Sequence, residues 1–277
     1  MRPPLRGALA ATAATAAVLS LGGLVPAAAL HPAAAPSSGA VECFTPGDDI
    51  AASARGGPEH AQDRDHRPVT AEQQRAIAER TARILARQDA NGKPGGGPGG
   101  PGGGGTVQVG GTIPVHVHVM AAANGAGDVT DDQVAQQIAA LNAQYGGQES
   151  SAAVDTGFTF TLAGIDRFYN DTWHADGASS KYRRATRQGD AGALNMWLVD
   201  FDYLGIATFP WDYARNGGID GVRVNFDSLP GGSIANYNLG DTATHEVGHW
   251  LGLYHTFQGG CTTTNDEVGD TPAQSSP

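Results

Sequence analysis

The spacing of three histidines near the carboxyl end constrains this chain more than any other feature of its sequence. Residues 245–255 read HEVGHWLGLYH, which has the form H-E-x-x-H-x-x-G-x-x-H. His245 and His249 are four residues apart, so on a helix they lie on one face and can hold one ion. His255 follows ten residues after His245, which is about 15 Å along a straight helix. The three side chains therefore converge only if the chain turns sharply after His249.

Gly252 lies where that turn is needed, and glycine enters the left-handed backbone region without steric cost. With the turn made, His245, His249 and His255 are expected to bind zinc and to leave its fourth position for water. Glu246 lies about 100° around the helix from its neighbour, so it flanks the metal. Zinc lowers the pKa of a bound water to about 7, and a nearby carboxylate can carry the proton to a leaving amine. The pattern predicts peptide-bond hydrolysis with Glu246 as general base and acid.

On these residues the chain resembles the metzincin metallopeptidases, and among them the pappalysin-like (cytophagalysin) family. The resemblance covers residues 106–277. It implies a zinc metalloendopeptidase that acts on proteins or peptides. It also implies an α/β (α+β) catalytic domain with a mixed twisted sheet, a backing helix and an active-site helix. The stretches that carry it are His245–His255, Thr256–Phe257, Gly260–Cys261 and Asp266–Gln274.

Metzincins carry a methionine-containing turn, the Met-turn, downstream of the third histidine. The methionines of this sequence are Met1, Met120 and Met196, all upstream of the motif, and the sequence ends at Pro277. We therefore expect a truncated family member with an incomplete lower subdomain. One alternative is a zinc-binding but catalytically inactive truncated remnant. Another is a zincin with a distant glutamate as third ligand, against which the glycine and third histidine of the motif argue.

Changes in composition divide the chain into four parts. An amino-terminal run begins with Arg2 and Arg6 and continues as an alanine-rich apolar stretch with an A-x-A site, which predicts a secretory signal and a secreted protein. A later Gly/Pro-rich stretch lacks side chains for a core and predicts a linker. We expect a signal peptide at 1–29, a largely irregular propeptide-like segment with one helix at 30–90, the linker at 91–105 and the truncated catalytic domain at 106–277.

Hydrophobic periodicity and capping residues predict the main elements. Thr70 with Gln73, and Thr130 with Gln133, are expected to open helices, and Asp241 is expected to be the N-cap of the zinc helix. On the first long strand, His116 and His118 are expected to lie on a half-exposed face rather than to bind metal. The expected strands cover residues 112–120, 158–162 extending toward 168, 194–199, 205–209 and 221–226.

The two cysteines of the chain, Cys43 and Cys261, allow at most one intramolecular disulfide. Three readings stay open: that disulfide, a free thiol, or a Cys43 thiolate on the open zinc position that keeps the enzyme latent, as in similar metzincins. Hard oxygen ligands gather at Asp266, Asp270 and Thr271. They predict either a calcium site, which the family resemblance supports, or an acidic turn before a proline.

Net charge and hydropathy limit the partners. The net charge of −11 argues against binding to nucleic acid, which needs a basic surface. After the expected signal, no stretch of sequence is long and apolar enough to span a bilayer, so we expect no stable membrane association. The expected partner is a protein or peptide substrate, and the sequence does not indicate an oligomeric state.

Overall fold

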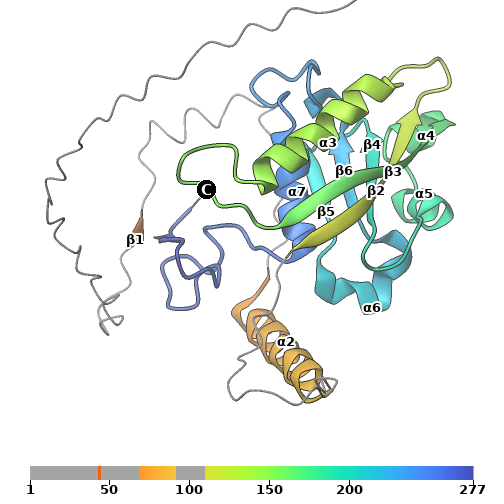
Figure 1. The fold of residues 1–277 in the computed structure, drawn as a ribbon. Helices are drawn as coiled ribbons and strands as arrows, with labels where there is room; N and C mark the ends of the chain where they lie inside the picture. Colours follow the sequence, from red (N-terminus) through yellow and green to blue (C-terminus); the bar gives the residue numbers. More distant parts are fainter. Residues whose placement is uncertain (1–42, 45–68, 92–109, 277) are drawn as a thin grey trace, which may run out of the picture. The chain divides into compact units, whose positions relative to one another are not determined.

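The computed structural model describes residues 43–44, 69–91 and 110–276 (Figure 1). The predicted signal peptide, most of the propeptide-like segment and nearly all of the predicted linker lie outside these residues. Among the helices of the described part, none is long and apolar enough to cross a membrane. The elements, in chain order, are β1 (Cys43–Phe44), α2 (Ala71–Asn91), β2 (Gly111–Ala121), α3 (Asp131–Tyr145), β3 (Phe158–Tyr169), α4 (Asp171–His174), α5 (Ser179–Thr186), β4 (Leu194–Val199), β5 (Gly205–Ala207), η1 (Pro210–Asp212), α6 (Tyr213–Asn216), η2 (Gly217–Ile219), β6 (Val222–Asn225), η3 (Phe226–Ser228), α7 (Asp241–Leu251) and β7 (Ala273–Gln274).

Five strands form one mixed sheet in the order β3-β2-β4-β6-β5. β2 pairs in parallel with β3 on one side and with β4 on the other, and β4 pairs in parallel with β6. β5 runs antiparallel to β6 and forms an edge of the sheet. β1 and β7 make a separate parallel pair. The expected α/β (α+β) fold with a mixed sheet is therefore confirmed.

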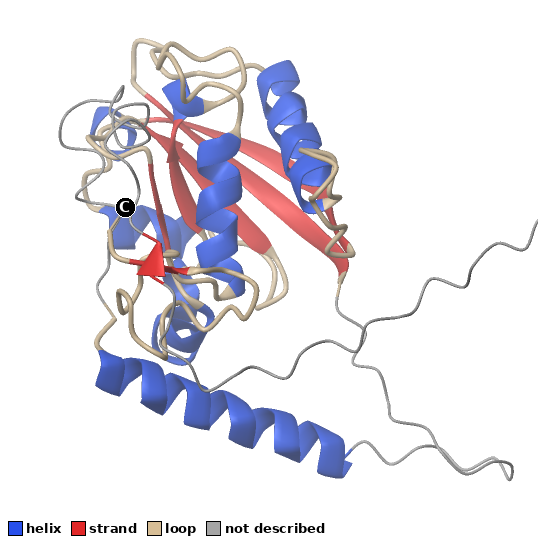
Figure 2. Cartoon of the chain, turned by 90° about the vertical axis from the view of Figure 1, so that its left-hand side faces the viewer, coloured by secondary structure: helices blue, strands red, loops and turns tan. Residues whose placement is uncertain are grey.

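Helices cover both faces of this sheet (Figure 2). α3 and α7 pack on one face, over the larger apolar cluster of the core. α4 and α5 lie on the other face, over a smaller cluster formed by Met120, Tyr182, Trp197 and Val199. Because both faces are covered, every residue of β4 is buried, as expected for a parallel strand inside a layered α/β fold. Alternate strand residues point into the larger cluster, namely Val115, Val117, Val119, Leu194, Met196 and Leu198.

The two predicted capping boxes are present. The N–H of Gln133 donates to the Thr130 hydroxyl at 3.2 Å, and the N–H of Thr130 donates to the Gln133 side-chain carbonyl at 3.2 Å. Thr70 and Gln73 make the same reciprocal pair at the start of α2, with distances of 3.2 and 2.8 Å. Each box satisfies two backbone donors that the first helical turn leaves free. At its other end α3 contacts α7, because the Tyr145 hydroxyl donates to the Thr244 carbonyl at 3.2 Å.

The start of α7 differs from the prediction. Gly240, with φ of 98°, is the N-cap residue, and no side chain caps the helix. Asp241 is instead the first helical residue, and its carboxylate accepts a hydrogen bond from Gln144 of α3. Position 240 has no room for a side chain, because a Cβ there would lie 2.9 Å from the Cβ of Ala140. The close approach of α3 thus requires glycine where the sequence suggested a polar cap.

The expectation of a half-exposed face for His118 is wrong. The side chain is fully buried, its ring stacks on Trp197 with centroids 5.4 Å apart, and its Nε2 lies 2.9 Å from the Asn195 side-chain oxygen. The layer of α4 and α5 covers this face, which strand periodicity alone does not reveal. Burial lowers the pKa of His118. This effect outweighs the hydrogen bond that the ring donates to the Asn195 side-chain oxygen and the negative charge of Asp166, both of which raise the pKa.

We expect the free energy of unfolding to fall as pH decreases below about 6.5, where a histidine in the unfolded chain gains its proton. The lowered pKa keeps folded His118 neutral to a lower pH, so proton uptake favours the unfolded state. Denaturant midpoints measured between about pH 7.5 and pH 5.5 test this. The variant His118→Gln keeps a donor toward Asn195 and should lose less stability over that range. An equal pH dependence of the two proteins would contradict the assignment.

Candidate metal centre

α7 presents the first two histidines of the motif while its other face packs on the sheet. Ala243 and Val247 are fully buried, and Trp250 is nearly so. His245 is exposed and His249 is buried, one helical turn apart. The apolar side of the helix thus fixes its rotation, and this rotation directs both imidazoles to one place.

The helix ends in a sharp reversal at Gly252. This residue has φ of 109° and ψ of 7°, a backbone conformation that residues other than glycine rarely adopt. Its N–H donates to the His249 carbonyl, and the N–H of Leu253 donates to the Gly248 carbonyl, both at 2.9 Å. These bonds are the glycine-terminated helix end that satisfies otherwise free carbonyls. The reversal brings His255 back beside the first two histidines, as the sequence predicted.

The three imidazoles meet at their Nε2 atoms. The separations are 3.1 Å between His245 and His249, 3.2 Å between His249 and His255, and 3.3 Å between His245 and His255. Each Nε2 atom either donates or accepts a hydrogen, but not both. Two of the three atoms must therefore have the same role, so the three contacts cannot all be hydrogen bonds. Zn–N bonds of about 2.0–2.1 Å in a tetrahedron place ligand nitrogens about 3.3–3.4 Å apart. The triangle therefore fits one shared zinc ion.

A backbone contact fixes the hydrogen on one of these rings. His249 Nδ1 lies 2.8 Å from the Leu253 carbonyl oxygen, which can only accept. The hydrogen of a neutral His249 ring is therefore on Nδ1, and the lone pair on Nε2 points toward the other two rings. Hydrogen bonds of this kind orient metal-binding histidines in proteins. The helix reversal thus also supplies the carbonyl that prepares His249 to bind.

Aromatic rings surround the triangle. Phe209 packs against His249 with centroids 5.3 Å apart, and Phe257 stacks on His255 at 4.8 Å with 13° between the ring planes. Trp211 stacks on Phe209 at 4.5 Å and contacts Tyr254 at 5.3 Å. Burial, followed by the charge of Glu267, raises the pKa of Tyr254 to about 12. Its phenol therefore stays neutral at physiological pH.

A cleft of about 800 Å³ opens beside the three rings. One wall comes from α3 and α7, and the other comes from the chain that follows the helix. The lining combines apolar and aromatic side chains with carboxylates and amides. The residues that line it are Gln144, Tyr145, Glu149, Thr156, Asp241, Thr244, His245, Gly248, His249, Leu253, Tyr254, His255, Thr256, Phe257 and Gln274.

Glu246 follows the first histidine and is only 1 % exposed. α7 packs on β5 and β6, and the Glu246 side chain lies against Gly205 of β5. The carboxylate is therefore held between the helix and the edge strand of the sheet. It is not one of the three groups whose ligand atoms share the metal position.

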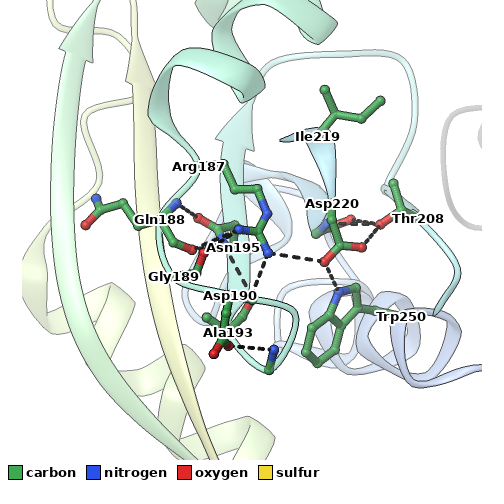
Figure 3. Close-up of polar contacts among 12 residues, drawn as sticks. Arg187, Gln188, Gly189, Asp190, Ala193, Asn195, Thr208, Ile219, Asp220 and Trp250 are labelled. Carbon is green, nitrogen blue, oxygen red and sulfur yellow. Dashed lines mark hydrogen bonds and ion pairs between the residues drawn. The ribbon is translucent and has the colours of Figure 1, made fainter. Parts of the chain in front are cut away.

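A buried carboxylate outside the motif connects these elements (Figure 3). Asp220 accepts hydrogen bonds from the Trp250 indole at 3.0 Å and from the Thr208 hydroxyl at 2.8 Å. Arg187 lies 3.7 Å from the same carboxylate, and both side chains are at least nine-tenths buried. Arg187 also donates to the carbonyls of Gly189 and Asp190, at 2.7 and 2.6 Å.

The hydrogen bonds of Asp220 hold two residues that adjoin the metal position in the chain, Trp250 and Thr208. Trp250 follows His249 on α7, and Thr208 precedes Phe209, whose ring packs on His249. One carboxylate thus ties the helix to the strand end that supports the same imidazole. Neither Asp220 nor Thr208 could be recognised from the sequence, because an isolated aspartate in a loop gives no spacing signal.

The remaining predicted site residues lie apart from the triangle. Within the described residues, the three histidines are the one group of three or more His, Cys, Asp or Glu side chains with ligand atoms close enough to share an ion. Asp266, Asp270 and Thr271 are not part of this group, and no finding supports calcium there. Asp266 is buried and accepts the Val268 N–H at 3.2 Å, which fits the alternative of an acidic turn. Cys261 takes part in a disulfide bond.

The helix α7, its reversal at Gly252 and the three converging imidazoles are typical of one class of proteins. In this class the metal centre is built on an extended H-E-x-x-H helix. Residues 201–277 match the family Peptidase_M43, pregnancy-associated plasma protein-A. An "Extracellular metalloprotease" of Verticillium alfalfae is 44 % identical over 174 residues, covering 59 % of this chain and 58 % of its own length. An "Extracellular metalloprotease" of Colletotrichum graminicola is 40 % identical over 173 residues, covering 60 % and 59 %. The chain thus spans less than two thirds of the curated relatives it matches.

Solved structures agree with the sequence matches. Mirolysin in complex with compound 9 is 30 % identical, with a TM-score of 0.53 over 59 % of this chain and 72 % of its own. Tannerella forsythia mature mirolysin in complex with a cleaved peptide is 28 % identical, with a TM-score of 0.52 and the same coverage. The chain belongs to the Peptidase_M43 family of metzincins.

We expect Gly252→Ala to lower both stability and zinc affinity. A Cβ at this φ costs about 1–2 kcal/mol, and relief of the strain would move His255 away from the other rings. Gly248→Ala is the matched control, because its Cβ would meet nothing closer than 3.7 Å and helix interiors favour alanine. Calorimetric zinc titration and denaturant unfolding measure the two effects. Equal zinc affinity in both variants would contradict the role given to the reversal.

We expect Asp220→Asn to lower the free energy of unfolding by about 3 kcal/mol, because it leaves a buried guanidinium without its counter-charge. Glu79→Gln removes a pair of similar length, 3.8 Å, between solvent-exposed partners on α2, and should change stability very little. Denaturant unfolding of both variants provides the test. A loss for Asp220→Asn as small as that for Glu79→Gln would show that the network does not hold the helix.

Proposed function

We propose that this protein is an extracellular zinc metalloendopeptidase that hydrolyses peptide bonds in proteins or peptides. The observation that carries the proposal is the triangle of Nε2 atoms, 3.1–3.3 Å apart, formed by His245, His249 and His255. These three residues would hold the ion. The donor set favours zinc, because neutral imidazole nitrogen is a preferred zinc ligand and three protein ligands leave a position open.

Zinc bound there would supply Lewis-acid polarisation and a water of lowered pKa. The chain's own contribution is Glu246. Its carboxylate, one residue from a ligand, would accept a proton from the attacking water and pass it to the departing amine. Burial of this side chain keeps bulk water away and strengthens its electrostatic interactions. The roles of general base and general acid thus fall to one group.

The substrate follows from the cleft and from the relatives. A cleft of about 800 Å³ beside the triangle is large enough for several residues of an extended peptide. Tyr145, Leu253 and Phe257 offer it apolar surface next to the histidines. Relatives carry the name extracellular metalloprotease, and one solved structure is of mature mirolysin in complex with a cleaved peptide. These observations support proteins or peptides as substrates.

The organisation of the chain completes the proposal. Residues 1–29 would direct export, residues 30–90 would form a propeptide-like segment, and residues 91–105 would link it to the catalytic part at 106–277. We assign the disulfide of Cys261 to Cys43, the only other cysteine of the sequence. An exported protein favours such a bond. A cysteine in a disulfide offers no thiolate to a metal, so this assignment speaks against zinc-bound latency through Cys43.

We expect Glu246→Gln to keep one zinc per chain but to lose about 10²–10⁴-fold in cleavage rate, because glutamine cannot accept the proton. Asp132→Asn, which changes an exposed carboxylate on α3 outside the cleft, is the control and should cleave like the wild type. Zinc by elemental analysis and casein cleavage test this. Cleavage by Glu246→Gln at the wild-type rate would refute the assignment. A wild type that binds zinc without turnover would favour the inactive alternative.

A further inference from the structure

A glycine on the edge strand β5, Gly205, leaves the space that the Glu246 side chain fills. Gly205 is buried, and its φ lies outside the left-handed region, so its backbone conformation does not require glycine. A Cβ added there would lie 2.5 Å from Glu246 Oε1, 2.7 Å from Cδ and still nearer to Cγ. Cβ atoms essentially never approach other atoms so closely, so the side chain of Glu246 occupies the place that a methyl group at 205 would need.

The strand cannot easily move away to make that room. β5 is paired with β6, and the Leu204 carbonyl accepts the Asn225 N–H at 2.8 Å. At the other end, the N–H of Thr208 donates to the Gly221 carbonyl at 3.0 Å, and its hydroxyl donates to Asp220. Backbone and side-chain bonds thus hold β5 on both sides of Gly205.

The helix is held as firmly as the strand. Trp250 of α7 donates to the same Asp220 carboxylate that binds Thr208. One buried carboxylate therefore connects α7 to the end of β5. With both backbones held by these bonds, a larger residue at 205 would have to displace the Glu246 side chain.

We propose that Gly205 is a positioning residue, whose lack of a side chain creates the space that holds the Glu246 carboxylate in its reactive place. The inference rests on the function proposed for Glu246. A misplacement of about 1 Å in a catalytic group can cost about 100-fold in rate. A methyl group at 205 should therefore reduce the rate of the chemical step and leave the three imidazoles unchanged.

Gly205→Ala tests this in the full chain, with casein as substrate and zinc titration as a second readout. The expected result is a fall in kcat of about 10- to 100-fold, with KM and zinc affinity close to the wild type. Gly164→Ala is the matched control, because it lies in a strand of the same sheet and its Cβ would meet nothing within 4 Å. Wild-type kcat in Gly205→Ala, or loss of zinc, would overturn the proposal.

A double-mutant cycle separates positioning from general damage. In the Glu246→Gln background the base is absent, so adding Gly205→Ala should not reduce the residual rate further. A multiplied loss would mean that the methyl group acts through the strand or the metal, and would overturn the inference.

A structural readout is independent of the proposed function. In a crystal structure of Gly205→Ala we expect the Glu246 carboxyl to move while β5 and the three imidazoles stay in place. An unmoved carboxyl would overturn the steric claim even if the wild type proved inactive. If Gly205→Ala alone does not fold, Glu246→Ala removes the atoms that its Cβ would meet, so the double variant should fold as well as Glu246→Ala. Failure of the double variant to fold would also overturn the claim.

Discussion

The arrangement of this molecule depends on bringing three imidazole nitrogens to within 3.3 Å of one another. Lone pairs at such distances repel unless a cation lies among them, so the surrounding structure must hold the rings in place. Two of the rings come from one face of α7. The third comes from a chain that reverses at a glycine with φ of 109°. Neither part creates a metal position without the other.

The sheet supplies the fixed frame for this helix. Its apolar side packs on the larger cluster of the core, and Asp220 adds a polar attachment through Trp250. The same carboxylate holds Thr208, so the edge strand and the helix share one anchor. A buried ion pair stabilises little by itself, because desolvation offsets much of the attraction. The contribution of Asp220 here is geometric, because it connects α7 to the end of the strand that lies against Glu246.

Features set by local spacing could be read from the sequence. The two Thr-x-x-Gln capping boxes, the buried strand at 194–199 and the turn at Gly252 all depend on residues close together in the chain. The motif likewise predicted which histidines converge.

Features set by contacts between distant segments could not be read. His118 is buried because α4 and α5 cover its face of the sheet, and the N-cap at Gly240 is set by the approach of α3. Asp220 binds Trp250, 30 residues further along the chain, and Gly205 lies against Glu246 of a different element. No pattern of spacing or periodicity marks such positions. The candidate metal ligands were therefore predictable, but the residues that hold them and Glu246 in place required the structure.

X-ray absorption spectroscopy of the zinc-loaded protein tests the central claim most directly, because it reports the atoms bound to the ion. The account predicts three imidazole nitrogens and one oxygen at about 2.0–2.1 Å. It also predicts that His255→Ala removes one nitrogen from this set. A spectrum with fewer than three imidazoles, or one that His255→Ala leaves unchanged, would contradict it.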